Sequence, residues 1–179
     1  IQDGLVVDAI SLCDWVSCLL EYGTGRNDGL FIKAAYEGNQ EVNNLCLCLS
    51  ASKERLQETT ELGQAFIRTV NSSYGSGLPE GLAYPVAVGR AAQKAGIDLK
   101  LTLQSYLQAF AANLISVGVR IIPIGQQAGQ DCLVNLYPAI RRLSEKVSHV
   151  SLDQLGGAVF LSDLMAMKHE QSIPRIYRT

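Results

Sequence analysis

Apolar residues recur along this chain with the roughly 3.6-residue period of an amphipathic helix, not with the alternation of a strand. The first stripe consists of Leu12, Trp15, Val16, Leu19 and Leu20. Ser11 is placed to cap this helix and Gly23 to end it. No run of strict alternation occurs elsewhere in the sequence. The pattern therefore predicts helices and no sheet.

Each further apolar stripe follows a polar residue that suits a helix N-cap. These residues are Asp28, Asn39, Ser52, Asp98 and Ser151. Asp28 would cap a short helix that ends near Gly38. Ser151 and Gln154 match a capping box, which predicts a last helix that runs through Met165.

Glycine and proline divide the remaining stretches. Residues 72–81 contain Ser, Gly and Pro in close succession and are predicted to form a loop. Pro85 suits the first turn of the helix that follows this loop. Pro138 falls inside the stripe of residues 126–147, where we expect a kink or a new helix start near Leu136.

The length of 179 residues makes one compact unit the default, and two units are possible only if both are small. The 179 residues are 47% hydrophobic and only 18% charged, which is enough apolar surface for a buried core. The mean hydropathy is +0.12. We therefore predict an all-α, single-domain helical bundle of about seven to nine helices over residues 1–179.

The net charge and the cysteines indicate which binding partners and which cellular location are expected. A net charge of −2 gives no general attraction to nucleic acid or to an anionic membrane. The apolar stretch 109–125 is interrupted by Asn113, Arg120 and Pro123, and it is too short and polar to cross a bilayer. The five cysteines are an odd number, irregularly spaced and without a preceding signal peptide. Reduced thiols and a cytoplasmic location are expected.

No catalytic or cofactor motif is present. The sequence has no phosphate-binding loop, no dinucleotide fingerprint, no zincin motif and no nucleophile elbow. With His149 and His169 as its only histidines, one protomer cannot supply a three-histidine metal site. Cys46 and Cys48, and the series Met165, Met167 and His169, could be soft-metal ligands. Because helical residues two apart project in different directions, we favour core filling for these side chains.

The expected helix over residues 101–119 has a second face of small and polar side chains. This face comprises Ser105, Ala109, Ala112, Asn113, Ser116 and Arg120. One interpretation is a tight packing seam within the chain, with Asn113 buried and hydrogen-bonded. The other is an interface with a partner or a second copy, with the polar groups fixing register. The sequence favours the first modestly.

Several blocks, in order, resemble the urease accessory protein family UreF. They include Gly81 to Gly89 around Tyr84-Pro85, and Tyr106 to Leu114. The central block continues with Pro123, Gly125, Gln126, Gly129 and Gln130, and the end of the chain with Asp163 to Glu170 and Arg175 to Thr179. Ser11 to Asp28 fits the first half of the family. Two departures are the absence of the family's N-terminal segment and the pair Ile173-Pro174 in the tail.

The resemblance implies an all-α, non-enzymatic assembly factor without a cofactor of its own. UreF-like proteins form homodimers and bind UreD, also called UreH. Together they recruit the GTPase UreG to apo-urease, so that nickel enters the active site. The GTP would be held by UreG, because this chain has no phosphate loop.

The blocks also suggest which residues bind partners and which form a dimer. Expected partner-binding residues are Tyr84, Pro85, Gly89, Gln126, Gly129, Gln130, His169, Glu170, Arg175, Ile176, Tyr177 and Arg178. The tail has the arginine and aromatic composition of interface hot spots. The small-residue face of helix 101–119 is the candidate dimer interface. Two alternatives remain: a generic helical interaction module, and a regulator of the GTPase acting through Arg120, Arg175 or Arg178.

Overall fold

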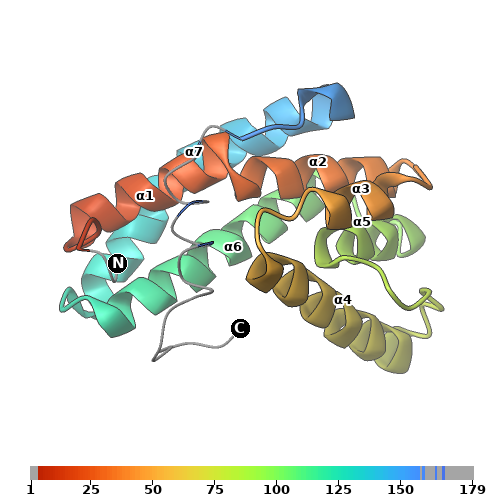
Figure 1. The fold of residues 1–179 in the computed structure, drawn as a ribbon, viewed down its shortest axis with the longest axis horizontal. Coiled ribbons are helices and arrows are strands. Elements are labelled where there is room, and N and C mark those ends of the chain that lie inside the picture. The colour runs from red at the N-terminus through yellow and green to blue at the C-terminus, as the bar shows by residue number, and fades with distance from the viewer. Residues whose placement is uncertain (1–3, 158, 160–163, 165–166, 168–179) are drawn as a thin grey trace.

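The computed structural model describes residues 4–157, 159, 164 and 167, and within them the chain forms helices and no strand (Figure 1). Its α-helices span Ala9–Tyr22 (α1), Thr24–Tyr36 (α2), Val42–Cys48 (α3), Lys53–Tyr74 (α4), Tyr84–Lys94 (α5), Leu99–Ile121 (α6) and Gly125–His149 (α7). A 3-10 turn, η1, follows at Leu152–Gln154. The predicted all-α class is confirmed.

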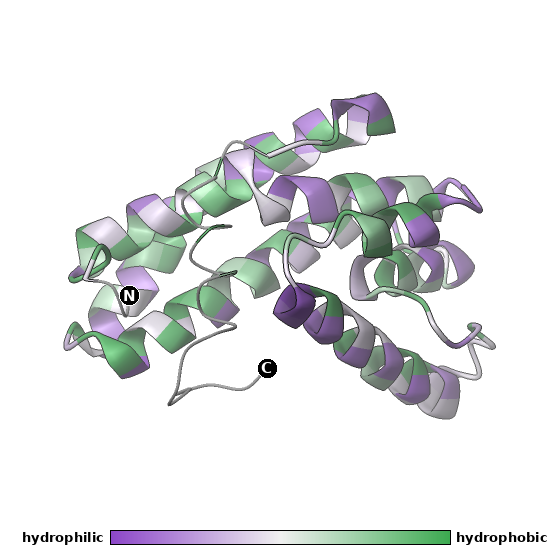
Figure 2. Ribbon diagram, in the orientation of Figure 1, coloured by the Kyte–Doolittle hydropathy of each residue, from purple (hydrophilic) through white to green (hydrophobic). Residues whose placement is uncertain are grey.

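Helix α2 is the central element, because it packs against α1, α5, α6 and α7. One buried cluster between α1, α2, α6 and α7 includes Leu12, Leu30, Leu107, Leu136 and Val147. A second cluster between α2, α3, α4 and α5 includes Phe31, Val42, Ile67, Val86 and Ala87. Figure 2 shows apolar and polar residues sharing the same helices, as amphipathic helices do. Among the described helices, none has an apolar stretch that would reach across a bilayer.

Asp8, and not Ser11, is the N-cap of α1. The Asp8 carboxylate accepts a hydrogen bond from the Ser11 backbone N–H at 2.8 Å, and Ser11 Oγ accepts one from the Asp8 N–H at 3.1 Å. This reciprocal pair is a capping box, so Ser11 has a capping role one turn inside the helix. The helix ends at Gly23 as predicted.

The predicted helix start at Asp28 is wrong. Helix α2 already begins at Thr24, directly after Gly23, and Asp28 lies inside it with only 5% of its surface exposed. Its carboxylate accepts hydrogen bonds from Arg55 and Tyr106 rather than from helix N–H groups. The sequence pattern is misleading because these two partners are remote in the chain.

The local helix signals at Ser52, Asp98 and Pro85 are confirmed. Asn39 instead precedes α3, whose N-cap is Glu41, and its side-chain oxygen accepts the N–H groups of Glu41 and Val42. Ser52 Oγ accepts the Arg55 N–H of α4, and Asp98 Oδ1 accepts the Leu101 N–H of α6. Pro85 lies in the first turn of α5. Pro138 lies inside a continuous α7, so the alternative of a new helix start near Leu136 is wrong.

The predicted last helix does not begin at Ser151. The side chain of Ser151 makes no capping hydrogen bond, and the turn η1 ends at Gln154. Gly156 then adopts a positive φ of 153°, which no helix allows. Asn27 Oδ1 accepts the Gly156 N–H at 3.3 Å, which fastens this extended segment to α2. The prediction overlooked the glycine pair, Gly156-Gly157; the expected end of the helix at Met165 is outside the described residues.

Candidate functional site: an aromatic and acidic cleft between α4 and α6

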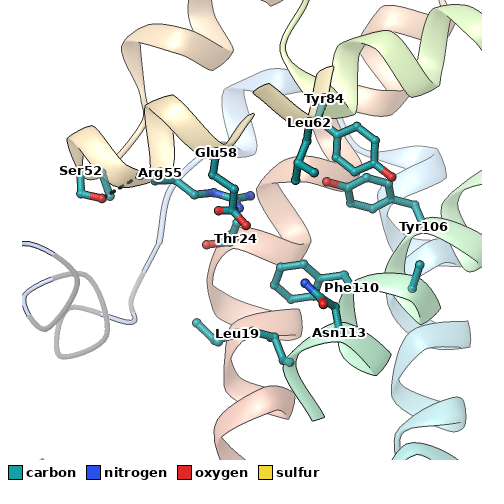
Figure 3. A pocket seen from close by; sticks show the side chains of 13 residues that line it. Leu19, Thr24, Ser52, Arg55, Glu58, Leu62, Tyr84, Tyr106, Phe110 and Asn113 are labelled. Atoms are coloured by element: carbon teal, nitrogen blue, oxygen red, sulfur yellow. Dashed lines mark hydrogen bonds and ion pairs between the residues drawn. The ribbon is translucent and has the colours of Figure 1, made fainter. Parts of the chain in front are cut away.

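An open cleft of about 480 Å³ lies between α4 and α6, beside the start of α5 and the α1–α2 junction. Its lining includes Arg55 and Glu58 from α4, Tyr84 from α5, and Phe110 and Asn113 from α6. Figure 3 shows Arg55 and Glu58 extending from α4 toward the side of the cleft that carries Phe110 and Asn113. The cleft therefore combines charged, polar and aromatic groups.

Aromatic rings form one wall of the cleft. The rings of Tyr84 and Tyr106 have centroids 5.5 Å apart and are tilted by 41°. On its other side Tyr84 meets Phe66 edge-on, at 5.7 Å and 74°. These contacts fix the Tyr84 ring between α4 and α6, as is favourable for aromatic pairs at such distances.

An ionic network underlies the α4 side of the cleft. Arg55 Nη2 donates to Asp28 Oδ2 at 2.9 Å, and Arg55 Nη1 donates to Glu58 Oε2 at 2.7 Å. The Tyr106 hydroxyl donates to the same Asp28 oxygen at 2.7 Å. The guanidinium of Arg55 thus binds two carboxylates, and the network links α2, α4 and α6.

Burial controls the ionisation of these groups. Desolvation raises the pKa of Asp28 above its ordinary value of 3.8, although the charge of Arg55 opposes this change. Desolvation by itself would lower the pKa of Arg55, but the carboxylates of Asp28 and Glu58 outweigh it and raise this pKa. Desolvation, with the Asp28 charge second, raises the pKa of Tyr84 and Tyr106. Arg55 is therefore a permanent cation, and both tyrosines are neutral phenols near pH 7.

The small-residue face of α6 points outward. Its exposed members are Ser105, Ala109, Asn113, Ser116 and Arg120, and Ala112 is half-buried. The interpretation that this face is an internal seam with a buried Asn113 is therefore wrong. Ala109 and Asn113 instead line the cleft.

The residues of the Tyr-Pro-x-x-x-Gly block have different surroundings. Tyr84 is half-buried in the cleft wall, whereas Pro85 and Gly89 are buried. A Cβ at Gly89 would lie 2.4 Å from the Ile32 carbonyl oxygen and 3.0 Å from the Ala35 Cβ. Gly89 therefore permits the close approach of α5 to α2, and Tyr84 is the member of the block that reaches the cleft.

The central block surrounds the start of α7. Gln126 and Gln130 are exposed, while Gly129 is buried. A Cβ at Gly129 would lie 2.6 Å from Val119 Cγ2, so this glycine allows α6 and α7 to pack closely. The stretch Pro123 to Gln130 of the central block thus offers two exposed glutamines and does not line the cleft, whereas its earlier stretch, Tyr106 to Leu114, does.

The predicted tail residues lie outside the described part of the chain. These are His169, Glu170, Arg175, Ile176, Tyr177 and Arg178. Cys46 is buried and Cys48 is exposed, so the core-filling interpretation is confirmed for the first and wrong for the second. Within the described residues, no three His, Cys, Asp or Glu side chains are grouped closely enough to hold a metal ion.

Sequence reasoning missed the ionic network. The sequence pattern predicts a helix cap at Asp28 and assigns no role to Glu58. A local signal existed, because Arg55 and Glu58 are three residues apart on one helix. For Asp28, the sequence gives no comparable indication that Arg55 and Tyr106 are its partners.

Comparisons with known protein sequences point to one family. A sequence model of the UreF family matches residues 6–137. The urease accessory protein UreF of Roseobacter denitrificans is 39% identical over 183 residues, covering the whole chain and 82% of that protein. Its namesake from Ruegeria pomeroyi is 40% identical over 184 residues, again covering the whole chain and 84% of the relative. The urease accessory protein UreF of Rhodopseudomonas palustris is 37% identical over 195 residues, and the match covers the whole of this chain and 82% of that relative.

The helices and the cleft together define an all-α protein with an open, aromatic-walled cleft. The percent identity and the coverage of the sequence matches show to which family this protein belongs. The chain belongs to the UreF family of urease accessory proteins. All the described residues that line the cleft, including Tyr84, Phe110 and Asn113, lie within the matched residues.

Proposed function

We propose that this chain is a cytoplasmic, non-enzymatic scaffold for urease maturation. In this role it binds UreD, also called UreH, and recruits the GTPase UreG to apo-urease, where nickel is inserted. Nickel is the cargo of that assembly and GTP is held by UreG. Family membership supports the link to urease, because the relatives are named urease accessory proteins.

The observation that carries this proposal is the outward orientation of the small-residue face of α6. Ala109 and Asn113 are exposed, and both contribute to an open cleft. Small side chains allow another backbone to approach closely, and polar groups among them can fix its register. A surface of this composition suits protein docking.

Two further surfaces take part in the proposal. The exposed Ser105, Ser116 and Arg120 belong to the same face of α6 as the cleft residues Ala109 and Asn113, and we propose the part of this face outside the cleft as the interface of a two-fold homodimer. The tail from His169 to Arg178 is proposed as a second docking element for UreD or UreG, on the grounds of its arginine and aromatic content. Gln126 and Gln130 provide an additional exposed polar patch.

Capture of purified partners tests this function. The full chain, immobilised, is expected to retain UreD and, once UreD is present, UreG. Deletion of residues 171–179 should weaken capture and leave the helical circular dichroism spectrum unchanged. If the full chain captures neither partner, the scaffold role is wrong; if the deletion captures both as well as the full chain does, the tail has no docking role.

A further inference from the structure

The charges that meet at the cleft do not cancel. Arg55 neutralises one carboxylate, but both Asp28 and Glu58 are bonded to it, at 2.9 and 2.7 Å. Asp28 lies behind the guanidinium with its side chain 6% exposed, whereas the Glu58 side chain is 24% exposed and lines the cleft. With both carboxylates ionised, the network has a charge of −1 that faces the opening.

The walls around this charge are aromatic and apolar. Phe110 and the stacked pair Tyr84 and Tyr106 line the cleft, and Leu62 and Leu114 are at its sides. The faces of aromatic rings attract cations, and guanidinium groups stack on them more readily than ammonium groups do. Among the described residues of the lining, Arg55 and Glu58 are the charged ones. A second cation that enters the cleft can therefore bind the Glu58 carboxylate, with Arg55 as the one positive side chain of that described lining.

We propose that the cleft is a socket for one arginine side chain of a partner protein, presented between apolar residues. Its guanidinium would bind Glu58 and stack on the aromatic wall, while its neighbours contact Leu62 and Leu114. This inference rests on the proposed scaffold function, since it names the side chain by which a partner is recognised. Charge complementarity selects a basic residue, and the aromatic wall selects arginine over lysine.

Binding of short peptides to the isolated 179-residue chain tests the proposal without any urease component. The probes are acetyl-Leu-Arg-Leu-amide and its neutral counterpart with citrulline in place of arginine, followed by backbone NMR. We expect saturable shifts at Tyr84, Phe110 and Asn113 with the arginine peptide, and at least about fivefold weaker binding of the citrulline peptide. Equal binding of the two peptides, or shifts away from the cleft, would overturn the proposal.

Variants test whether the arginine peptide binds in the cleft or is only attracted by the overall charge of the protein. Glu58→Gln should weaken the arginine peptide about fivefold or more, whereas Glu61→Gln, an exposed residue of the same helix that does not line the cleft, should change it less than about twofold. Phe110→Leu keeps an apolar side chain and the ionic network, and should also weaken the arginine peptide selectively. Equal effects of Glu58→Gln and Glu61→Gln, or no effect of Phe110→Leu, would contradict the socket.

The experiment also distinguishes other occupants and the scaffold function itself. If the peptide binds only after residues 171–179 are deleted, the chain's own tail fills the cleft and the assignment to a partner is wrong. Peptide binding at the cleft combined with failure to capture UreD or UreG supports the socket but contradicts the scaffold function. Capture of the partners without peptide binding contradicts the socket alone.

Discussion

Arg55 in the first turn of α4 is bonded to Asp28 in the middle of α2, with Nη2 2.9 Å from Oδ2 across 27 residues of sequence. The Tyr106 hydroxyl of α6 binds the same carboxylate oxygen. Among the helices of the described chain, α4 packs chiefly on α5. This pair therefore links the N-terminal end of α4 directly to the central helix and shapes the cleft.

Asp28→Asn should destabilise the protein strongly, because it leaves the mostly buried Arg55 with one carboxylate instead of two. Removing one partner of a buried ion pair costs about 3–5 kcal/mol. The control is Glu37→Gln, which breaks the exposed pair with Lys33 and should cost less than about 0.5 kcal/mol. Urea unfolding followed by circular dichroism measures both changes. Equal losses in the free energy of unfolding for the two variants would show that the buried pair stabilises the fold no more than the exposed pair does.

Gly63→Ala should also destabilise the protein, although alanine is the better helix former by about 1 kcal/mol. A Cβ at Gly63 would lie 2.2 Å from the Leu82 carbonyl oxygen and 3.0 Å from the Tyr84 backbone nitrogen. Backbone atoms cannot rotate away, so α4 must shift, at a cost of about 1–3 kcal/mol. Gln64→Ala, at an exposed position of the same helix, is the control and should be nearly neutral. A gain in stability for Gly63→Ala would show that the contact is not tight.

Glu145 should titrate below its ordinary pKa of 4.5 in the folded protein. The side-chain hydrogen bond with Lys100 is the largest cause of the lowered pKa, followed by that with His149. Because the folded pKa is the lower one, this pair stabilises the fold above pH 4.5 and the contribution is lost as the pH falls through the folded value. A carboxyl-carbon NMR titration of Glu145 measures the midpoint. Lys100→Met should move it back toward 4.5, and an unchanged midpoint would contradict the assigned cause.

Dimerisation through α6 predicts a specific effect of bulk and charge on its exposed face. Ser116→Arg places a large cation at an exposed position of the proposed interface and should convert the homodimer to a monomer at micromolar concentration. Asn135→Arg, at an exposed position of α7, should leave the dimer intact. Light scattering gives the mass of each variant. A wild-type monomer, or equal masses for both variants, would exclude α6 as the interface.

Local signals predicted the starts of α4, α5 and α6 because the groups involved are within one turn of each other. The cap at Ser52, the cap at Asp98 and the proline of α5 are of this kind. Asp28 could not be assigned in this way, since its partners are 27 and 78 residues away. The predicted helix start at Ser151 is wrong for a different reason: the apolar stripe continues past Gly156 and Gly157, but the backbone does not remain helical there.

The site was only partly predictable. Tyr84 was selected as part of a motif, and Ala109 and Asn113 as part of a small-residue face, without any indication that they meet. The tertiary packing of α5 against α4 and α6 brings these two signals into one cleft. The carboxylate that gives the cleft its charge, Glu58, is indistinguishable in sequence from its solvated neighbour Glu61.

Urease activity in cells that carry the urease genes but lack this gene tests the scaffold account most directly. Wild type should restore activity, and so should the exposed control Asn135→Arg. Asn113→Arg puts a large cation into the cleft at an exposed position, so we expect it to restore less than about a tenth of the activity while its helical content is unchanged. Full activity with Asn113→Arg, or in cells without the gene, would contradict the central claim that this cleft serves urease assembly.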